Sequence, residues 1–162
     1  MKISELSLAQ MARTGCTHRF EITYADLSAT ADTTLTLTLS DLLAKGVKVE
    51  NVGFKVVTLF DGGATADLTL QIGFNVTAGT DVANGLLGEH SIYADAAYHL
   101  AGPRRDEARR ALTAVTDTYG PSGPSVFRET GTITALFTST SANLDALTVG
   151  EVHIFARIAL LA

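Results

Sequence analysis

Apolar and polar side chains alternate residue by residue along much of this chain, and this pattern restricts its fold more than any other feature. Residues 33–39 alternate threonine with leucine, and residues 17–25 and 151–160 follow the same period of two. A β-strand places successive side chains on opposite faces, whereas a surface helix needs a period of 3.6. Threonine, which occurs 22 times, is β-branched and favours strands. The sequence therefore predicts strands that each bury one face.

The middle of the chain predicts a hairpin. Residues 47–60 form one long strand in this interpretation, the Asp-Gly-Gly sequence at 61–63 forms the turn, and residues 67–76 return. Strands joined by a short turn are antiparallel neighbours. Gly53 predicts a β-bulge or a close backbone approach within the first strand. Residues 126–140 alternate again and add a further strand.

Helical segments are predicted at three places between the strands. Residues 40–46 (SDLLAKG) begin with capping residues and end in glycine, which predicts one helical turn. Residues 104–114 have helical composition and follow Pro103, and residues 143–147 predict a further turn. Residues 92–100 fit a short strand and a helix equally well.

Length and turn signals divide the chain into an arm and one domain. A chain of 162 residues corresponds to one domain, and about seven or eight short strands between turns are typical of a sandwich or barrel. We therefore expect an all-β fold, a β-sandwich of jelly-roll type, over residues 16–162, after an N-terminal arm at 1–15. Residues 77–91 predict a long loop that opens a loop–helix insertion at 77–125. The pattern of strands does not reveal their order, so an immunoglobulin-like topology stays open.

Charge and cysteine content exclude several classes of protein. A net charge of −5 and a pI near 5.2 argue against a nucleic-acid binder, which usually carries a basic surface. The single cysteine, Cys16, excludes an intrachain disulfide framework and a multi-cysteine zinc site. The N-terminal residues lack the apolar run of a secretory signal, and no stretch approaches the length of a membrane span. We therefore expect a soluble protein made in the cytoplasm, without nucleic-acid or membrane partners.

One pair of residues is a candidate for nucleophilic catalysis. Cys16 and His18 lie two residues apart, so in a strand they share a face, and a thiolate nucleophile needs such a base nearby. An incidental pair at the start of a strand is the favoured interpretation, and a cysteine hydrolase is the alternative. Ser122 lies in GPSGP, but a nucleophile elbow needs glycine where Pro124 stands. No set of residues combines nucleophile, base and oxyanion donors, so we expect neither enzyme activity nor a cofactor.

An acidic stretch and a basic cluster adjoin each other in the sequence. Between Val56 and Pro103 the chain has neither lysine nor arginine. Its aspartates fall where turns favour them and lack EF-hand spacing, so we expect an acidic surface rather than a metal site. The basic cluster that follows is either a solvated face with local salt bridges or a patch that meets the acidic surface of a neighbouring copy. It consists of Arg104, Arg105, Arg109 and Arg110.

Exposed apolar side chains complete the set of candidate contacts. The arm carries Leu6, Leu8 and Met11 without a core to bury them, so we expect the arm to order on binding. In the last strand, Phe155 lies opposite the apolar face, and it either marks an interface or is covered by the insertion. Two aromatic residues of the insertion are further candidates, Tyr93 and Tyr98.

Three segments together resemble a known group of proteins. Residues 67–73 (DLTLQIG) and 80–88 (TDVANGLLG) precede a longer segment at 130–158, TGTITALFTSTSANLDALTVGEVHIFARI. These segments are similar to those of small tailed-bacteriophage virion proteins encoded among the head genes, in which a strand of the form L-T-L-x-I-G precedes a loop rich in glycine, aspartate and alanine. The C-terminal third matches best. The segment RRDEARRAL, at 104–112, has no counterpart in that pattern.

The resemblance implies a capsid decoration (cement) protein with a β-sandwich or jelly-roll core. Such proteins bind the outside of the assembled shell, so the implied partner is the major capsid protein and the implied location is the virion surface. The resemblance also implies a homo-oligomer, a trimer or a dimer. The alternative is a tail, baseplate or fibre component of the same fold that binds a host glycan through loop tyrosines, among them Tyr119.

Overall fold

The computed structural model describes residues 1–43, 47–62, 68–76, 81–91, 116–118, 125–127 and 131–160. In these ranges strands predominate, and the strand pairings are antiparallel. The helices described are short: α1 (Leu8–Thr14), α2 (Tyr24–Leu27) and the 3-10 helix η1 (Leu144–Ala146). The strands are β1 (Lys2–Glu5), β2 (His18–Thr23), β3 (Thr34–Leu43), β4 (Val47–Asp61), β5 (Thr69–Val76), β6 (Asp81–Ser91), β7 (Thr116–Thr118), β8 (Ser125–Phe127), β9 (Gly131–Thr138) and β10 (Val149–Leu160). The predicted all-β class is confirmed.

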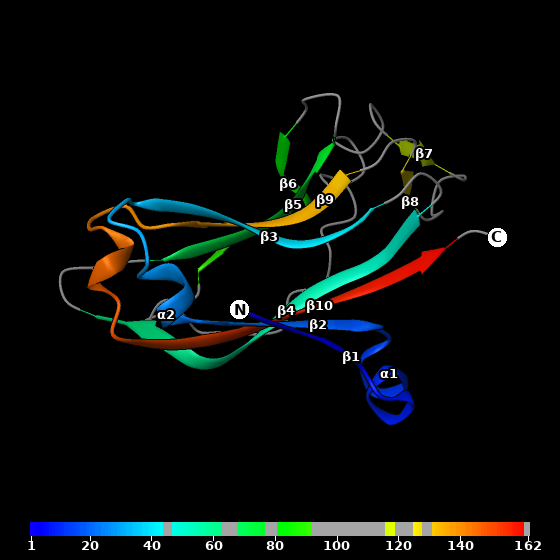
Figure 1. The fold of residues 1–162 in the computed structure, drawn as a ribbon, viewed down its shortest axis with the longest axis horizontal. Helices are drawn as coiled ribbons and strands as arrows, with labels where there is room; N and C mark the ends of the chain where they lie inside the picture. Colours follow the sequence, from blue (N-terminus) through cyan, green and yellow to red (C-terminus); the bar gives the residue numbers. More distant parts are fainter. Residues whose placement is uncertain are drawn as a thin grey trace.

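The strands form two sheets that face each other (Figure 1). One sheet has six strands in the order β1-β2-β10-β4-β8-β7, and the other has four in the order β3-β9-β5-β6. In the view of Figure 1, β3 and β9 of the four-stranded sheet lie above β2 and β10 of the six-stranded sheet, and α2 lies between the two layers at one end. In chain order, the described strands change sheet after β2, β3, β4, β6, β8 and β9.

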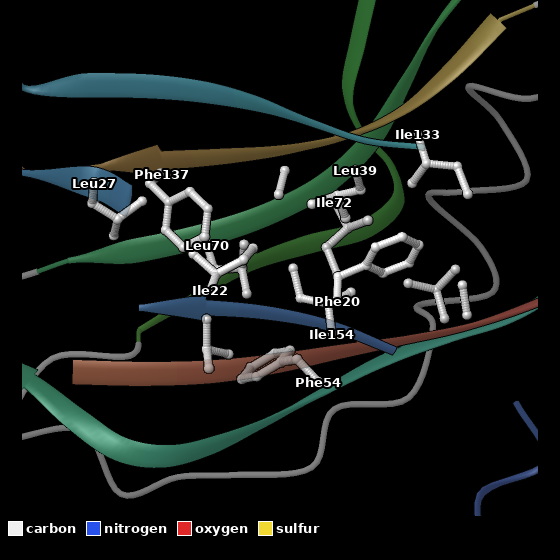
Figure 2. Packing of buried hydrophobic residues seen from close by; sticks show 14 of the residues in the cluster. Phe20, Ile22, Leu27, Leu39, Phe54, Leu70, Ile72, Ile133, Phe137 and Ile154 are labelled. Carbon is white, nitrogen blue, oxygen red and sulfur yellow. The ribbon is translucent and has the colours of Figure 1, made fainter. Parts of the chain in front are cut away.

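Alternation along the strands builds the core between the sheets (Figure 2). Phe20, Phe54 and Ile154 enter it from the six-stranded sheet. Ile72 and Phe137 enter it from the four-stranded sheet, and all five side chains are at most 1% exposed. Complete burial of such a side chain stabilises the fold by about 1.5–3 kcal/mol relative to exposure. Among the described residues, the two sheets therefore share one core, which the period of two supplies from both sides.

Helix α2 interrupts the alternation predicted for residues 17–25. Strand β2 ends at Thr23, and Tyr24 begins the helix with 39% of its surface exposed instead of joining the buried face. The Asp26 carboxylate accepts hydrogen bonds from Thr23 N at 2.9 Å and Thr23 Oγ1 at 3.0 Å, which completes a capping box. Leu27 then points into the core, where it is fully buried.

Strand β3 runs through residues that were predicted to form a helical turn (40–46). Ser40 pairs with Ile133, and Leu43 pairs with Gly131, with register irregularities between these pairs. The first four residues are therefore extended, and the prediction of a helix is wrong for them; the last three lie outside the described residues. A helix cap contributes only about 1 kcal/mol and a single turn is costly to nucleate, so pairing with β9 prevails.

The hairpin predicted between residues 47–60 and 67–76 is wrong, although both segments are strands. Strand β4 pairs with β10 and β8, whereas β5 pairs with β9 and β6 in the other sheet. The turn after β4 therefore leads from one sheet to the other. Gly62 has a φ of +152°, and a Cβ there would lie 2.3 Å from the Ala146 carbonyl oxygen. Only glycine fits this crossing without strain.

Two further predictions concern glycine-containing segments. Residues 81–91 form β6 instead of the predicted loop, and β6 pairs with β5 in an irregular register. Gly53 was predicted to mark a β-bulge or a close backbone approach; it pairs regularly with Phe155, so the bulge is wrong, and the register shifts of the β4–β10 ladder lie elsewhere. Glycine weakens a strand without forbidding it, so the pairing available from a neighbouring strand decides.

The C-terminal segment follows its prediction most closely. The helical turn predicted at 143–147 is η1, and the last strand is β10. Val152, Ile154 and Ala156 of β10 are buried, and the intervening side chains lie on the opposite face. In contrast, residues 92–115 lie outside the described residues, and with them the helix predicted for 104–114.

Candidate functional site

The N-terminal segment, residues 1–15, is folded onto the six-stranded sheet. Strand β1 pairs with β2 along its length, from Lys2 opposite Glu21 to Glu5 opposite His18. Helix α1 follows β1 closely in the sequence and lies below the six-stranded sheet in the view of Figure 1. The expected unstructured arm therefore has a strand and a helix of its own.

Helix α1 carries sequence signals that explain it. The Ser7 Oγ accepts a hydrogen bond from Gln10 N at 3.4 Å, and the Gln10 Oε1 accepts one from Ser7 N at 2.9 Å. This is a capping box of the form S-x-x-Q. Gly15 ends the helix in the left-handed conformation, with a φ of +69°. The S-x-x-Q pattern was visible in the sequence and identifies the helix start that the strand-based interpretation missed.

The candidate contact residues of this segment divide into covered and exposed ones. Leu6 is 5% exposed and is thus already buried within the chain, whereas Leu8 is 83% exposed. Met11 is half-buried. Met1 and Ile3, which the sequence interpretation did not select, are also large exposed apolar residues. Leu8, Ile3 and Met1 are therefore the side chains that this segment offers to a partner.

A row of charged and ionisable side chains crosses the outer face of the six-stranded sheet. Lys2 of β1 lies opposite Glu21 of β2, which lies opposite His153 of β10, and His153 lies opposite Lys55 of β4. Lys2 Nζ lies 3.5 Å from Glu21 Oε2, and Arg19 also pairs with Glu21. Cross-strand pairs of opposite charge stabilise a sheet by a fraction of a kcal/mol each.

Glu21 is the centre of this row. Burial raises the pKa of Glu21, but the positive charges of Arg19 and Lys2 outweigh burial and hold that pKa below its usual value. The carboxylate therefore stays charged at neutral pH and links β1 to β2. The Nε of Arg19 is buried without a hydrogen-bond partner within the described part of the chain. The spacing of Arg19 and Glu21 on one strand face was the sequence signal for this cluster, and it was overlooked.

Phe155 lies on the same outer face and is half-buried. Its ring meets that of His153 edge to face, with centroids 6.3 Å apart and an interplanar angle of 72°. Its cross-strand partners are Arg19 on one side and Gly53 on the other. His153 Nε2 also lies 2.6 Å from Glu151 Oε1. Phe155 therefore lies beside the ionisable side chains His153 and Arg19 on the outer face of the six-stranded sheet.

The Cys16–His18 pair lacks the features of an activated nucleophile. Cys16 is 3% exposed, and burial raises the pKa of its thiol above the usual value, with a smaller opposing effect from Arg157. The His18 Nδ1 lies 2.8 Å from Thr17 Oγ1. A buried thiol with a raised pKa holds little thiolate at neutral pH, so this geometry does not favour nucleophilic attack.

Several candidate residues fall outside the described residues. These are Tyr93, Tyr98, Tyr119, Ser122, Arg104, Arg105, Arg109 and Arg110. Of the acidic stretch, Asp61 accepts a hydrogen bond from Gly62 N at 2.8 Å and so serves the turn after β4. In the described ranges, no group of three or more His, Cys, Asp or Glu residues is placed to hold a metal ion.

The geometry thus offers two surfaces: the exposed apolar residues of the N-terminal segment and the ionic outer face of the six-stranded sheet. Among the described helices, none is long and apolar enough to cross a membrane. Comparison of the chain with protein-family models, curated proteins and solved structures finds no match.

Proposed function

We propose that this protein is a structural virion protein, a capsid decoration protein that binds the outside of the capsid and stabilises it. The proposal combines the resemblance of residues 130–158 to phage head proteins with a pattern of strand pairing that supports a jelly-roll assignment. Viral capsid domains are among the proteins built on jelly rolls. Residues 131–160 form β9, η1 and β10, so the segment that carries the resemblance supplies an interior strand to each sheet.

The jelly-roll assignment rests on how the strands pair. When β1 and the three-residue strand β7 are set aside, eight strands remain: β2, β3, β4, β5, β6, β8, β9 and β10. Of these eight, the first pairs with the last and the second with the seventh. The third pairs with the sixth and the fourth with the fifth. Such nested pairing is expected of one long ribbon of antiparallel strands rolled into two sheets, and it supports a jelly-roll assignment over the immunoglobulin-like alternative.

The exposed apolar residues of the N-terminal segment carry the proposed contact with the capsid. Leu8 is 83% exposed at the start of α1, and Ile3 is 53% exposed on β1. Both belong to the N-terminal segment, whose strand β1 pairs with β2 and forms an edge of the six-stranded sheet, so this segment is held in place before any partner binds. Many copies on one shell add weak contacts into a strong attachment.

The first test is the copy number of this chain in purified phage particles, measured by quantitative mass spectrometry against the major capsid protein. Near-stoichiometric abundance is the result expected of a decoration protein. A handful of copies per particle would move the protein to the tail, baseplate or neck, where a receptor-binding role is the alternative. Absence from the particles would overturn both assignments.

A second test addresses the contact itself. Leu8→Asp removes the most exposed apolar side chain of α1 and is expected to weaken binding of the purified protein to undecorated capsids at least tenfold, by about 1.4 kcal/mol. Ala9→Asp is the matched control, since Ala9 is exposed on the same helix turn and the added charge is the same. Equal binding by the two variants, measured by co-sedimentation with capsids, would exclude α1 from the contact.

A further inference from the structure

The outer edge of the four-stranded sheet is formed by β3, whose described pairing is with β9 alone. From Thr34 to Thr38 this pairing is regular, without a bulge. Thr34, Thr36 and Thr38 are exposed, and Leu35 and Leu37 are half-buried against the core. Alternate residues of such a strand direct their N–H and C=O groups away from the sheet, where they are ready to pair with another strand.

The other sheet edges carry the features that usually prevent pairing between sheets. Strand β1 has four residues and includes Lys2 and Glu5, and β7 has three residues. Strand β6 includes Asp81 and Glu89 and pairs irregularly with β5. Short length, charge and irregularity all discourage edge-to-edge association. Residues 34–38 of β3 contain neither charge nor proline and pair regularly with β9, while the register shifts and Asp41 lie in the later part of the strand.

The sequence of this edge is also self-complementary. In an antiparallel pair around a two-fold axis, each residue meets one that lies at the same distance on the other side of the axis. Because threonine and leucine alternate strictly over Thr34–Leu39, an axis through Thr36 or Leu37 places threonine opposite threonine and leucine opposite leucine at the pairs nearest to it. Threonine pairs and leucine pairs are favourable across strands, and no like charges meet.

We propose that two copies of this chain associate through β3, edge to edge and antiparallel, so that their four-stranded sheets join into one continuous sheet. The occupant is a second copy because the edge is uncharged and complements itself, as an isologous contact requires. Pairing would also cover Leu35 and Leu37, which the isolated chain leaves half-buried. This inference is independent of the proposed role on the capsid.

Oligomeric state tests the proposal. Sedimentation equilibrium of the full chain up to about 100 µM is expected to give a dimer, twice 17.0 kDa. Thr36→Lys brings like charges together across the axis and is expected to weaken the dimer at least about tenfold, with an unchanged circular dichroism spectrum. Ala12→Lys, on the exposed face of α1, and Thr36→Val, which keeps an uncharged β-branched side chain, are expected to remain dimeric.

Cross-linking tests the register. With the axis at Thr36, the Thr36→Cys variant is expected to form an intermolecular disulfide, since directly opposed residues lie within disulfide range. With the axis at Leu37, the Thr36→Cys/Thr38→Cys double variant is expected to do so instead. Three results would each overturn the proposal: failure of both variants to cross-link, a monomer at every concentration, or a dimer that persists in the Thr36→Lys variant. A dimer that persists in Thr36→Lys would place the contact on another surface. A monomer would leave β3 available to a strand from a different protein.

Discussion

Gly150 is a residue at which one added methyl group is expected to disturb the core. It is the second residue of β10 and has a φ of +141°, and a Cβ there would lie 2.2 Å from the ring of Phe60, which is fully buried. Gly150→Ala therefore adds backbone strain and displaces a core ring, and we expect it to lower the free energy of unfolding by about 2–4 kcal/mol. Urea denaturation of the two proteins measures this difference.

Gly15 provides the matched control. It also has a positive φ, +69°, but no heavy atom lies within 4 Å of the position that a Cβ would take. Gly15→Ala should therefore cost only the left-handed strain, about 1 kcal/mol. A loss for Gly150→Ala no larger than for Gly15→Ala would contradict the close packing of Gly150 against Phe60. The role of Gly150 is not visible in the sequence, because it depends on a φ angle and on a neighbour, Phe60, that is distant in the chain.

The Asp26 carboxylate makes the free energy of unfolding fall as the pH becomes acidic. Burial raises the pKa of Asp26, but its bonds to the N-terminal ammonium and to Thr23 outweigh burial and hold the pKa below its usual value. The folded state therefore binds this proton less tightly than the unfolded chain, so the stabilisation is complete above about pH 4 and disappears as the pH falls through the lower folded pKa.

We expect Asp26→Asn to destabilise the protein by about 1 kcal/mol at pH 7 and to differ little from the parent near pH 2. Urea denaturation at a series of pH values measures the two curves. Asp145→Asn is the control, since that carboxylate is exposed on η1. A difference between parent and Asp26→Asn that persists unchanged at pH 2 would show that the lost bonds do not depend on the carboxylate charge.

At the scale of elements, Leu6 attaches the N-terminal segment to the rest of the chain. Leu6 follows β1 and precedes α1 in the sequence, its side chain is buried, and its backbone N–H donates to the Thr17 carbonyl at 2.9 Å. Leu6→Ala removes this anchor and should cost about 2–3 kcal/mol locally. We expect faster tryptic cleavage at Arg13, which is exposed on α1, while Leu8→Ala leaves the rate nearly unchanged. Equal cleavage of both variants would mean that other contacts hold the segment.

Regular alternation predicted its strands correctly. Residues 34–39 and 151–158 turn one face toward the core as expected, because a period of two is a property of the strand itself. The loop predicted at 81–91 and the helical turn predicted at 40–43 were wrong, because these residues become strands by pairing with β5 and β9, which the local sequence does not reveal. Of the candidate contact residues, Leu8 could be identified from the sequence as an apolar residue of the N-terminal segment, and it is exposed. The burial of Leu6 could not be predicted, because it depends on how the whole segment folds.

At the scale of the whole molecule, the nested strand order ties the two sheets into one unit. Its consecutive strands β2, β3, β4 and β5 alternate between sheets, so neither sheet is made of one continuous part of the chain. Their inner faces meet in one core, in which Phe137 of the four-stranded sheet and Ile22 and Phe54 of the six-stranded sheet are members. Neither described sheet can therefore lose its core contacts without exposing those of the other.

Hydrogen exchange of the native protein can test this coupling. Phe137→Ala should lower the free energy of unfolding by about 3–5 kcal/mol, and it should lower the protection of slowly exchanging amides in β10 by the same amount as in β9. Val57→Ala, at an exposed position of β4, should change both by no more than about 0.5 kcal/mol. If β10 kept its protection in the Phe137→Ala protein, the six-stranded sheet would be stable by itself, and the crossings after β2, β3 and β4 would connect two independent units rather than close one core.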